Sequence, residues 1–442
     1  MRFERRLDTP RWLLVAVPVG SSIGALLVGA VVLLATGHNP MSTYFRLFER
    51  GFFSQSALSS TLRSATPLLF TGLAAAVAFR MRLWNIGAEG QLYMGAVGAS
   101  GIGLALRGSS ASVIIPAMIV AGIALGALWA LVPGVLRAFF NTNEIITSLM
   151  LNYVARLVLT YLILDSMSPW RDQSPGATFP LGARLPPEAS WPQFTTGLNF
   201  LAVALLASVI AFRVGAWARR PASDHSSRRP VVIVFTVGAV LVIVWGARAL
   251  GPTIVVPFGM VLGLISAVLI WVLYWEMRFG FQVRVISDSV AAARYGGMSP
   301  KRKIVAVMLL SGGLAGLGGA SQVGDFAHLL DPYGLPQSSY GYTGIVVAAL
   351  ACNNPFGAVL AAFLLGGLTN AGFSLRGLDF PLGLIGVLQG LILFFAIGGE
   401  VLVRYRLRLS QWRVHGDRGP LGDDPPDQGR STGTEVTTGR QQ

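Results

Sequence analysis

The sequence predicts an all-α polytopic membrane protein with about 10 to 12 transmembrane helices, some of them broken or re-entrant. Of its 442 residues, 53% are apolar and only 12% are charged, whereas soluble domains carry about a quarter charged residues. The apolar residues come in runs of about 17 to 25, the length that a helix needs to cross hydrocarbon. Most Lys and Arg residues lie in the short segments between these runs. The expected solvent is therefore a lipid bilayer.

The distribution of charge predicts the orientation of the chain. Lys and Arg collect on the cytoplasmic side of membrane proteins, which places the head at residues 1–11, segments 213–229 and 278–303, and the tail after Arg404 in the cytoplasm. Both termini are then cytoplasmic. The net charge of +14 does not form one basic stripe, so nucleic acid is not an expected partner. The first apolar run is too long for a signal peptide and lacks a small-residue cleavage site, so it is expected to remain as a span.

A transmembrane domain is expected over residues 12–410, with a disordered cytoplasmic tail, rich in Asp, Gly, Pro and Thr, over 411–442. A mixed segment at 37–65 and a Pro-rich polar segment at 165–193 are expected on the outer side. The predicted spans are 13–36, 66–81, 89–106, 112–140, 145–164, 200–212, 231–245, 254–275, 304–320, 343–352, 357–373 and 382–401.

Two of these spans are irregular. Residues 343–352 reach only about half the required length and are followed by Asn-Asn-Pro, which predicts a broken or re-entrant helix. The span at 66–81 stops at the segment 83–91, where two glycines and three polar side chains interrupt the apolar run. Non-helical backbone at membrane depth persists only where protein or a water-filled cavity satisfies its polar groups. The segment 83–91 is therefore a candidate functional site.

Small residues predict where helices approach closely. The pairs Gly312-x-x-x-Gly316 and Gly122-x-x-x-Gly126 place glycines on one helical face, as close membrane contacts require. The single cysteine, Cys352, excludes an intramolecular disulfide. Because it lies in an apolar run, we expect it to be a buried small hydrophobe.

Three sequence blocks resemble one family of bacterial membrane proteins. Residues 85–96, NIGAEGQLYMGA, resemble the signature of ABC-transporter permeases that import branched-chain amino acids, ribose and nucleosides. Residues 143–153, NEIITSLMLNY, are similar to a signature of the nucleoside and simple-sugar branch. Residues 291–298, AAARYGGM, followed by Lys-Arg-Lys, resemble the cytoplasmic coupling segment of these permeases. In that family the coupling block opens with Asn-Pro, where this chain has Asp288-Ser289.

The resemblance implies a permease subunit that forms the translocation path for a nucleoside or related small polar solute. It implies four partners: an ATP-binding-cassette ATPase subunit, a second permease subunit of the same or a related chain, an extracytoplasmic substrate-binding lipoprotein, and the lipid bilayer. It also implies a multi-pass protein of the bacterial plasma (inner) membrane. Relative to the family, residues 216–274 contain an inserted helical hairpin.

Polar residues of the first two blocks are the candidates for the path. Asn85, Glu89 and Gln91 either line or gate the translocation path, or they cap and brace a helix break at the cytoplasmic interface; both interpretations stay open. Asn85 and Glu89 are four residues apart, so they share one face of a turn if the segment is helical. Asn152 and Tyr153 fall in mid-span, where they are pore candidates or partners of a neighbouring helix.

The coupling segment, about residues 284–303, is expected to contain a short helix with little bulk. Its candidate docking residues are Ala291, Ala292, Arg294, Tyr295, Gly296 and Gly297. Small side chains let a short helix enter a partner's groove, while an arginine supplies a charged anchor. The alternative is an ordinary solvated basic loop.

Signs of an enzyme are absent from the sequence. The four histidines are scattered, and neither of the two lysines, Lys301 and Lys303, follows a glycine, so no phosphate-binding P-loop exists. We expect no catalytic residues, metal site or cofactor, and ATP hydrolysis would fall to another chain. The alternative function is a secondary transporter driven by an ion gradient, with Glu89 as its proton or sodium site. Neighbouring genes for a P-loop ATPase and a lipidated binding protein would favour the ABC transporter.

Overall fold

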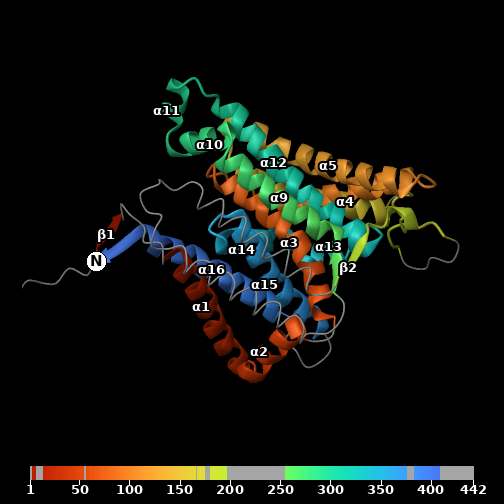
Figure 1. The fold of residues 1–442 in the computed structure, drawn as a ribbon, viewed down its shortest axis with the longest axis horizontal. Coiled ribbons are helices and arrows are strands. Elements are labelled where there is room, and N and C mark those ends of the chain that lie inside the picture. The colour runs from red at the N-terminus through yellow and green to blue at the C-terminus, as the bar shows by residue number, and fades with distance from the viewer. Residues whose placement is uncertain are drawn as a thin grey trace, which may run out of the picture.

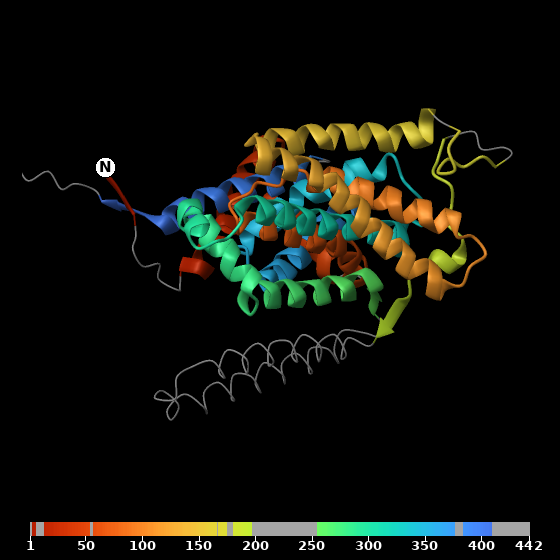
Figure 2. The ribbon, with the colours of Figure 1, turned by 90° about the horizontal axis from the view of Figure 1, so that it is seen from above.

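The structure is a computed structural model that describes residues 2–5, 13–53, 56–165, 167–174, 180–196, 254–375 and 383–408. It is a bundle of helices that run roughly along one axis (Figures 1 and 2). The helices are α1 (Leu13–Ala35), α2 (Pro40–Phe48), α3 (Ala57–Phe79), α4 (Ala88–Ala105), α5 (Ala111–Phe140), α6 (Glu144–Thr160), α9 (Phe258–Trp275), α10 (Arg278–Asp288), α11 (Val290–Tyr295), α12 (Pro300–Ser321), α13 (Gly334–Ser338), α14 (Tyr340–Leu350), α15 (Pro355–Ser374) and α16 (Leu384–Arg404).

Short π-helical turns extend or connect these helices, and strands are few. The π-helical turns are η1 (Glu49–Phe53), η2 (Tyr161–Asp165) and η5 (Gln322–Ala327), and η3 (Pro187–Ala189) is a 3₁₀ turn. Within the described ranges, the strands form two antiparallel pairs: β1 (Arg2–Arg5) with β4 (Tyr405–Arg408), and β2 (Gln193–Thr196) with β3 (Ile254–Pro257).

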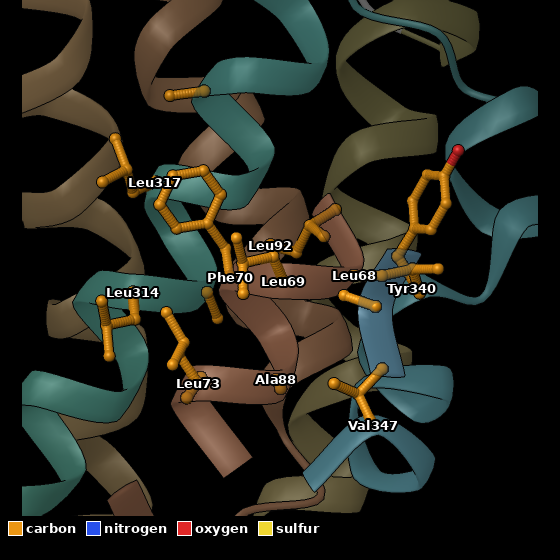
Figure 3. Packing of buried hydrophobic residues seen from close by; sticks show 14 of the residues in the cluster. Leu68, Leu69, Phe70, Leu73, Ala88, Leu92, Leu314, Leu317, Tyr340 and Val347 are labelled. Carbon is orange, nitrogen blue, oxygen red and sulfur yellow. The ribbon is translucent and has the colours of Figure 1, made fainter. Parts of the chain in front are cut away.

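Six helices in the described part of the chain are long and apolar enough to cross a membrane: α3, α5, α6 with η2, α9, α12 with η5, and α15. This confirms the prediction of an all-α polytopic membrane protein. The buried share of the apolar stretch is 83% for α3 and 72% for α12, but 22% for α5 and for α6. The helices α3 and α12 therefore form the centre, while α5 and α6 offer broad surfaces to lipid or to another subunit. Figure 3 shows the central side chains of α3, α4, α12 and α14 converging around Phe70, Leu92 and Leu317.

The predicted glycine contact is confirmed. Gly126 of α5 faces α12 so closely that a Cβ there would lie 2.6 Å from the Cα of Gly316. Gly122 lies against Gly316 and Ala320 in the same interface, and Gly95 of α4 also approaches Gly316 closely. Backbone contact of this kind replaces the hydrophobic driving force that helices lack in lipid.

The two ends of the bundle differ. Pairing of β1 with β4 brings the N-terminal strand and the strand after α16 to the end that carries α10 and α11 (Figure 1), as the predicted topology requires. At the opposite end, the segment expected as an outer loop packs onto helix ends: Trp170 Nε1 donates to Val97 O at 3.1 Å, and Trp191 N donates to Gly324 O at 3.0 Å. Following the orientation expected from the basic residues, we call the first the cytoplasmic end and the second the outer end.

Several predicted boundaries need correction. The helix expected at 66–81 begins at Ala57, because part of the mixed segment 37–65 continues α3 and Pro67 is accommodated inside it. Cys352 is exposed rather than buried, because it sits at φ +48° in the turn between α14 and α15. The spans at 200–212 and 231–245 and the tail at 411–442 lie outside the described residues, as does most of the hairpin 216–274 except β3 and α9.

Candidate functional site

The chain folds back into the bundle between α3 and α4. After α3 ends at Phe79, Arg82 takes a left-handed conformation with φ +57°, and α4 begins only at Ala88. Asn85 Nδ2 donates to Ser311 Oγ at 2.8 Å, and Ser311 Oγ donates to Ala74 O at 2.7 Å. Ala74 lies five residues before the end of α3, so the backbone at Asn85 is about 8 Å inside that end. This is non-helical backbone within the helical body.

The side-chain amides of Asn85 and Gln91 hydrogen-bond to each other and so connect the segment between α3 and α4 to the first turn of α4. Asn85 Nδ2 donates to Gln91 Oε1 at 2.8 Å, and Gln91 Nε2 donates to Asn85 Oδ1 at 2.9 Å. Gly87 N also donates to Asn85 Oδ1, at 3.1 Å. Asn85 is 0% exposed and Gln91 1%. Because each buried polar atom has a partner, the break can exist at this depth without water.

Glu89 joins the fold-back to a second broken helix. Its Oε1 accepts from Tyr93 Oη at 2.5 Å, and its Oε2 accepts from the backbone N–H groups of Gly341 at 2.5 Å and Tyr342 at 3.3 Å. All three partners act as donors, which suits a carboxylate. Gly341 and Tyr342 form the first turn of α14, so a negative group is placed where the helix dipole favours it.

The helix α14 is the half-length element that the sequence predicted. Its 11 residues span about 16 Å, against about 30 Å of hydrocarbon. The backbone oxygen of its first residue, Tyr340, accepts a hydrogen bond from Thr71 Oγ1 at 2.9 Å. Thr71 lies eight residues before the end of α3, so the start of α14 is about 12 Å inside that end. Two helices, α4 and α14, therefore begin near each other inside the bundle, with Glu89 between them.

Asn152 of α6 ties the two helix starts together. Its Oδ1 accepts from Gly90 N at 2.9 Å, and its Nδ2 donates to Ile86 O at 2.9 Å and to Tyr342 Oη at 3.2 Å. Tyr153 instead points away from the junction, with 60% of its surface exposed. Four of the five path candidates thus meet at one place, and the fifth lies on the outer face of α6.

The condition for a shared helical face of Asn85 and Glu89 is not met, and four partners were not foreseen: Tyr93, Ser311, Gly341 and Tyr342. Asn85 and Glu89 do not share a helical face, because the helix starts between them at Ala88. Tyr93 was recognisable as the residue one turn after Glu89. Ser311 and Tyr342 are more than 180 residues from their partners in the chain, so no local pattern connects them.

A cavity of about 370 Å³ opens above this junction towards the outer end. Its wall carries both polar and aromatic side chains. One of the lining residues, Tyr340, is the first residue of α14, so the cavity extends to the start of that helix. The lining includes Arg63 of α3, Gln322 and Phe326 of η5, Asp331, Gln337 of α13, and Asn370 of α15. Among the described residues, no group of three His, Cys, Asp or Glu side chains could hold a metal ion.

The segment expected to couple to an ATPase, about residues 284–303, comprises the end of α10, the short helix α11 and the start of α12. Ser289, which replaces the family's usual proline, caps α11: its Oγ accepts from Ala292 N at 3.2 Å. Ala293 is buried beneath the helix, while Tyr295 is 98% exposed, and Gly297 ends the turn at φ +72°. Ala291, Ala292, Arg294, Gly296 and Gly297 are exposed with Tyr295. The small face of α11 is therefore available to a partner.

One arginine connects the cytoplasmic ends of three helices. The guanidinium of Arg80, just after α3, lies 3.8 Å from the Trp275 ring centroid and 5.2 Å from that of Tyr274, both in α9. Its Nη2 donates to Asn353 O at 3.1 Å, in the turn after α14. The helix α9 leads directly into α10 and α11, so Arg80 joins the coupling segment to the half-length helix.

The chain is similar to known permeases over most of its length. Residues 57–397 match the family described as branched-chain amino acid transport system / permease component. The chain is 29% identical to a glucose ABC transporter permease protein of Haloferax volcanii, over 93% of this chain and 94% of the relative. It is 29% identical to a guanosine ABC transporter permease protein of Bacillus subtilis, over 80% of this chain and 84% of the relative.

A third relative supports the same assignment. The chain is 26% identical to a nucleoside ABC transporter permease protein of Lactococcus lactis, over 86% of this chain and 90% of the relative. No solved structure is significantly similar to the chain.

Proposed function

The chain belongs to the family of permease components of branched-chain amino acid transport systems, and we propose that it carries a nucleoside through the membrane as part of an ATP-binding-cassette importer. The observation that carries this proposal is its similarity to guanosine and nucleoside permeases over at least 80% of the chain. Because one relative is a glucose permease, the class of solutes proposed for this chain extends to small, neutral, hydroxylated solutes.

The geometry supports a path that runs from the outer cavity past the α4–α14 junction. The cavity reaches Tyr340; next to it, Glu89 accepts from the backbone N–H of Gly341 and Asn152 donates to the Tyr342 hydroxyl. Asn85, Glu89, Gln91 and Asn152 brace this junction, which acts as the gate. Because α14 spans only half the bilayer, a small shift of it changes the contacts at mid-depth. Tyr153 points away from this junction, so it would meet the solute only at the exposed surface of α6.

The energy for transport comes from a separate ATPase subunit. The relatives are permease subunits of ABC transporters, and the sequence has no lysine in a P-loop context. The ATPase docks on the face formed by Ala291, Ala292, Arg294, Tyr295, Gly296 and Gly297. Movement of α11 reaches α14 through α10, α9 and the contact of Arg80 with Asn353.

The complete importer contains three further kinds of subunit in a bacterial plasma membrane. A second permease subunit, of the same or a related chain, packs against the exposed surfaces of α5 and α6, of whose apolar stretches only 22% is buried. A substrate-binding lipoprotein delivers the solute at the outer end. The ATPase subunits cover the cytoplasmic end.

Uptake by a deletion strain tests the proposed substrate. We expect removal of this chain to abolish uptake of labelled guanosine, with labelled glucose and leucine measured in parallel. Restoration of guanosine uptake by the wild-type chain, but not by a chain lacking residues 290–297, would support both substrate and coupling. Loss of leucine uptake alone would contradict the nucleoside assignment while leaving the permease assignment intact.

A further inference from the structure

We propose that Arg156 of α6 faces the water-filled transport path and contacts the solute, so that it selects neutral solutes rich in acceptor oxygens and excludes cations. This inference rests on the proposed function and adds to it a specificity-determining residue.

Arg156 lies at a depth where a cation is costly. The helical stretch from Glu144 to Asp165 has 22 residues, and Arg156 is about 18 Å from its first residue and about 14 Å from its last. Both distances place it near the middle of about 30 Å of hydrocarbon. Long cationic side chains escape to the interface only near helix ends. At mid-depth a guanidinium must find a partner or water.

The described residues supply no carboxylate partner for the guanidinium. Arg156 is exposed, and within the part of the chain that the structure describes no acidic side chain lies within ion-pair distance of it. The helix α6 runs along one edge of the bundle, where it is the yellow helix at the top of Figure 2. Among the described residues, only the phenols of Tyr93 and Tyr342 lie near enough to interact with its charge, so the guanidinium is left largely to water, solute or another subunit.

The neighbours of Arg156 distinguish a water-facing surface from a lipid-facing one. Asn152, Arg156 and Thr160 follow one another at four-residue intervals, so they form a polar strip along one face of α6. Asn152 is hydrogen-bonded to Tyr342 Oη, and Tyr342 is 38% exposed. The strip thus leads from the surface of α6 to the junction at α14.

The adjoining face of α6 is apolar. Met150, Leu157 and Tyr161 are 50%, 68% and 58% exposed, and these side chains suit lipid or an apolar subunit contact. Water in contact with the bundle at this depth is therefore expected along the polar strip. A second permease subunit placed against the apolar face would close the strip into a channel.

The chemistry of a guanidinium sets the class of solute. It offers five N–H donors and accepts no hydrogen bond, so it binds hydroxyl and carbonyl oxygens such as those of a sugar or a nucleobase. Its planar face also stacks on aromatic rings, and the exposed ring of Tyr153 lies one turn earlier on the same helix. A fixed positive charge repels cationic solutes from the path.

Cysteine labelling tests the exposure of Arg156 to water. Arg156→Cys and Leu157→Cys are each made in a Cys352→Ser chain, assembled with its ATPase in membrane vesicles, and treated with a charged thiosulfonate from either side. Leu157 is the matched control, because it is the next residue and is 68% exposed on the apolar face. We expect Arg156→Cys to react at least tenfold faster. Equal rates, or no reaction of Arg156→Cys from either side, would overturn the proposal.

Transport by charge variants tests the contact with solute. Arg156→Gln should raise the KM for guanosine about tenfold or more, and Arg156→Lys should recover most of the loss, while Arg107→Gln at the outer end serves as the control. An unchanged KM in Arg156→Gln would overturn the contact even if labelling is fast. Fast labelling of Arg156→Cys in a protein that does not transport guanosine would instead overturn the proposed substrate alone.

Discussion

Replacing Glu89 with glutamine tests the role of the α4–α14 junction most sharply. The amide keeps the size of the side chain, and its oxygen can still accept from Gly341 N and Tyr342 N. Its NH₂ group, however, would face the Tyr93 hydroxyl, which must rotate to accept. Hydrogen bonds to charged groups contribute about 1.5 to 3 kcal/mol and neutral ones about 0.5 to 1.5 kcal/mol. The variant also loses the favourable interaction between the negative charge and the dipole at the α14 N-terminus. Together these losses should destabilise the protein by about 2 kcal/mol.

A larger loss is expected for Glu89→Leu, because it leaves two buried N–H groups without an acceptor, at about 1 to 3 kcal/mol each. Thermal unfolding of the purified protein and uptake of labelled guanosine in cells are measured for both variants. Glu89→Gln should insert normally but transport severalfold more slowly, since the gate is less firmly held. The control is Glu188→Gln, which changes an exposed glutamate in the outer loop. Wild-type melting and uptake in Glu89→Gln would refute the reasoning.

Three further predictions follow from other parts of the structure. Ala292→Trp should weaken copurification of the ATPase tenfold or more, about 1.4 kcal/mol. The control is Ala111→Trp, at an exposed helix start of the outer end, which should leave copurification unchanged. Equal copurification of the two variants would show that α11 does not dock on the ATPase. Gly126→Val should lower stability by about 1 to 3 kcal/mol through overpacking against α12, measured by thermal unfolding, whereas Gly20→Val, with nothing within 4 Å of an added Cβ, should be silent. A cysteine at Ser299, in a chain without the native cysteine, should react with an impermeant reagent only after cells are permeabilised; reaction in intact cells would reverse the topology.

The sequence was sufficient for the elements whose signals are local. Apolar runs predicted α5, α15 and α6 together with its extension η2 to within two residues, because length and hydropathy decide a membrane span. The short run before Asn-Asn-Pro correctly indicated a half-length helix. The start of α3 was missed because its first turns carry polar residues that pack inside the bundle instead of facing water, as Thr61 does at 0% exposure.

The site was only half predictable, for a physical reason. Asn85, Glu89 and Gln91 stand out because polar groups in an apolar run need an explanation. Their hydrogen-bond partners could not be predicted from the sequence. Ser311 and Gly341 belong to helices distant in the chain, and only the fold brings them next to Asn85 and Glu89. The predicted span 145–164 already contained Arg156, but which face of the helix the side chain lies on, and that it is exposed there, follows only from the packing of α6.

ATP-dependent uptake into proteoliposomes is the measurement that tests the central claim most directly. This chain is purified with the ATPase that accompanies it from native membranes, reconstituted with its binding protein, and supplied with labelled guanosine and ionophores that abolish ion gradients. The account predicts uptake that requires both ATP and the binding protein and is unaffected by the ionophores. Uptake that proceeds without ATP and collapses when the ion gradient is removed would contradict it.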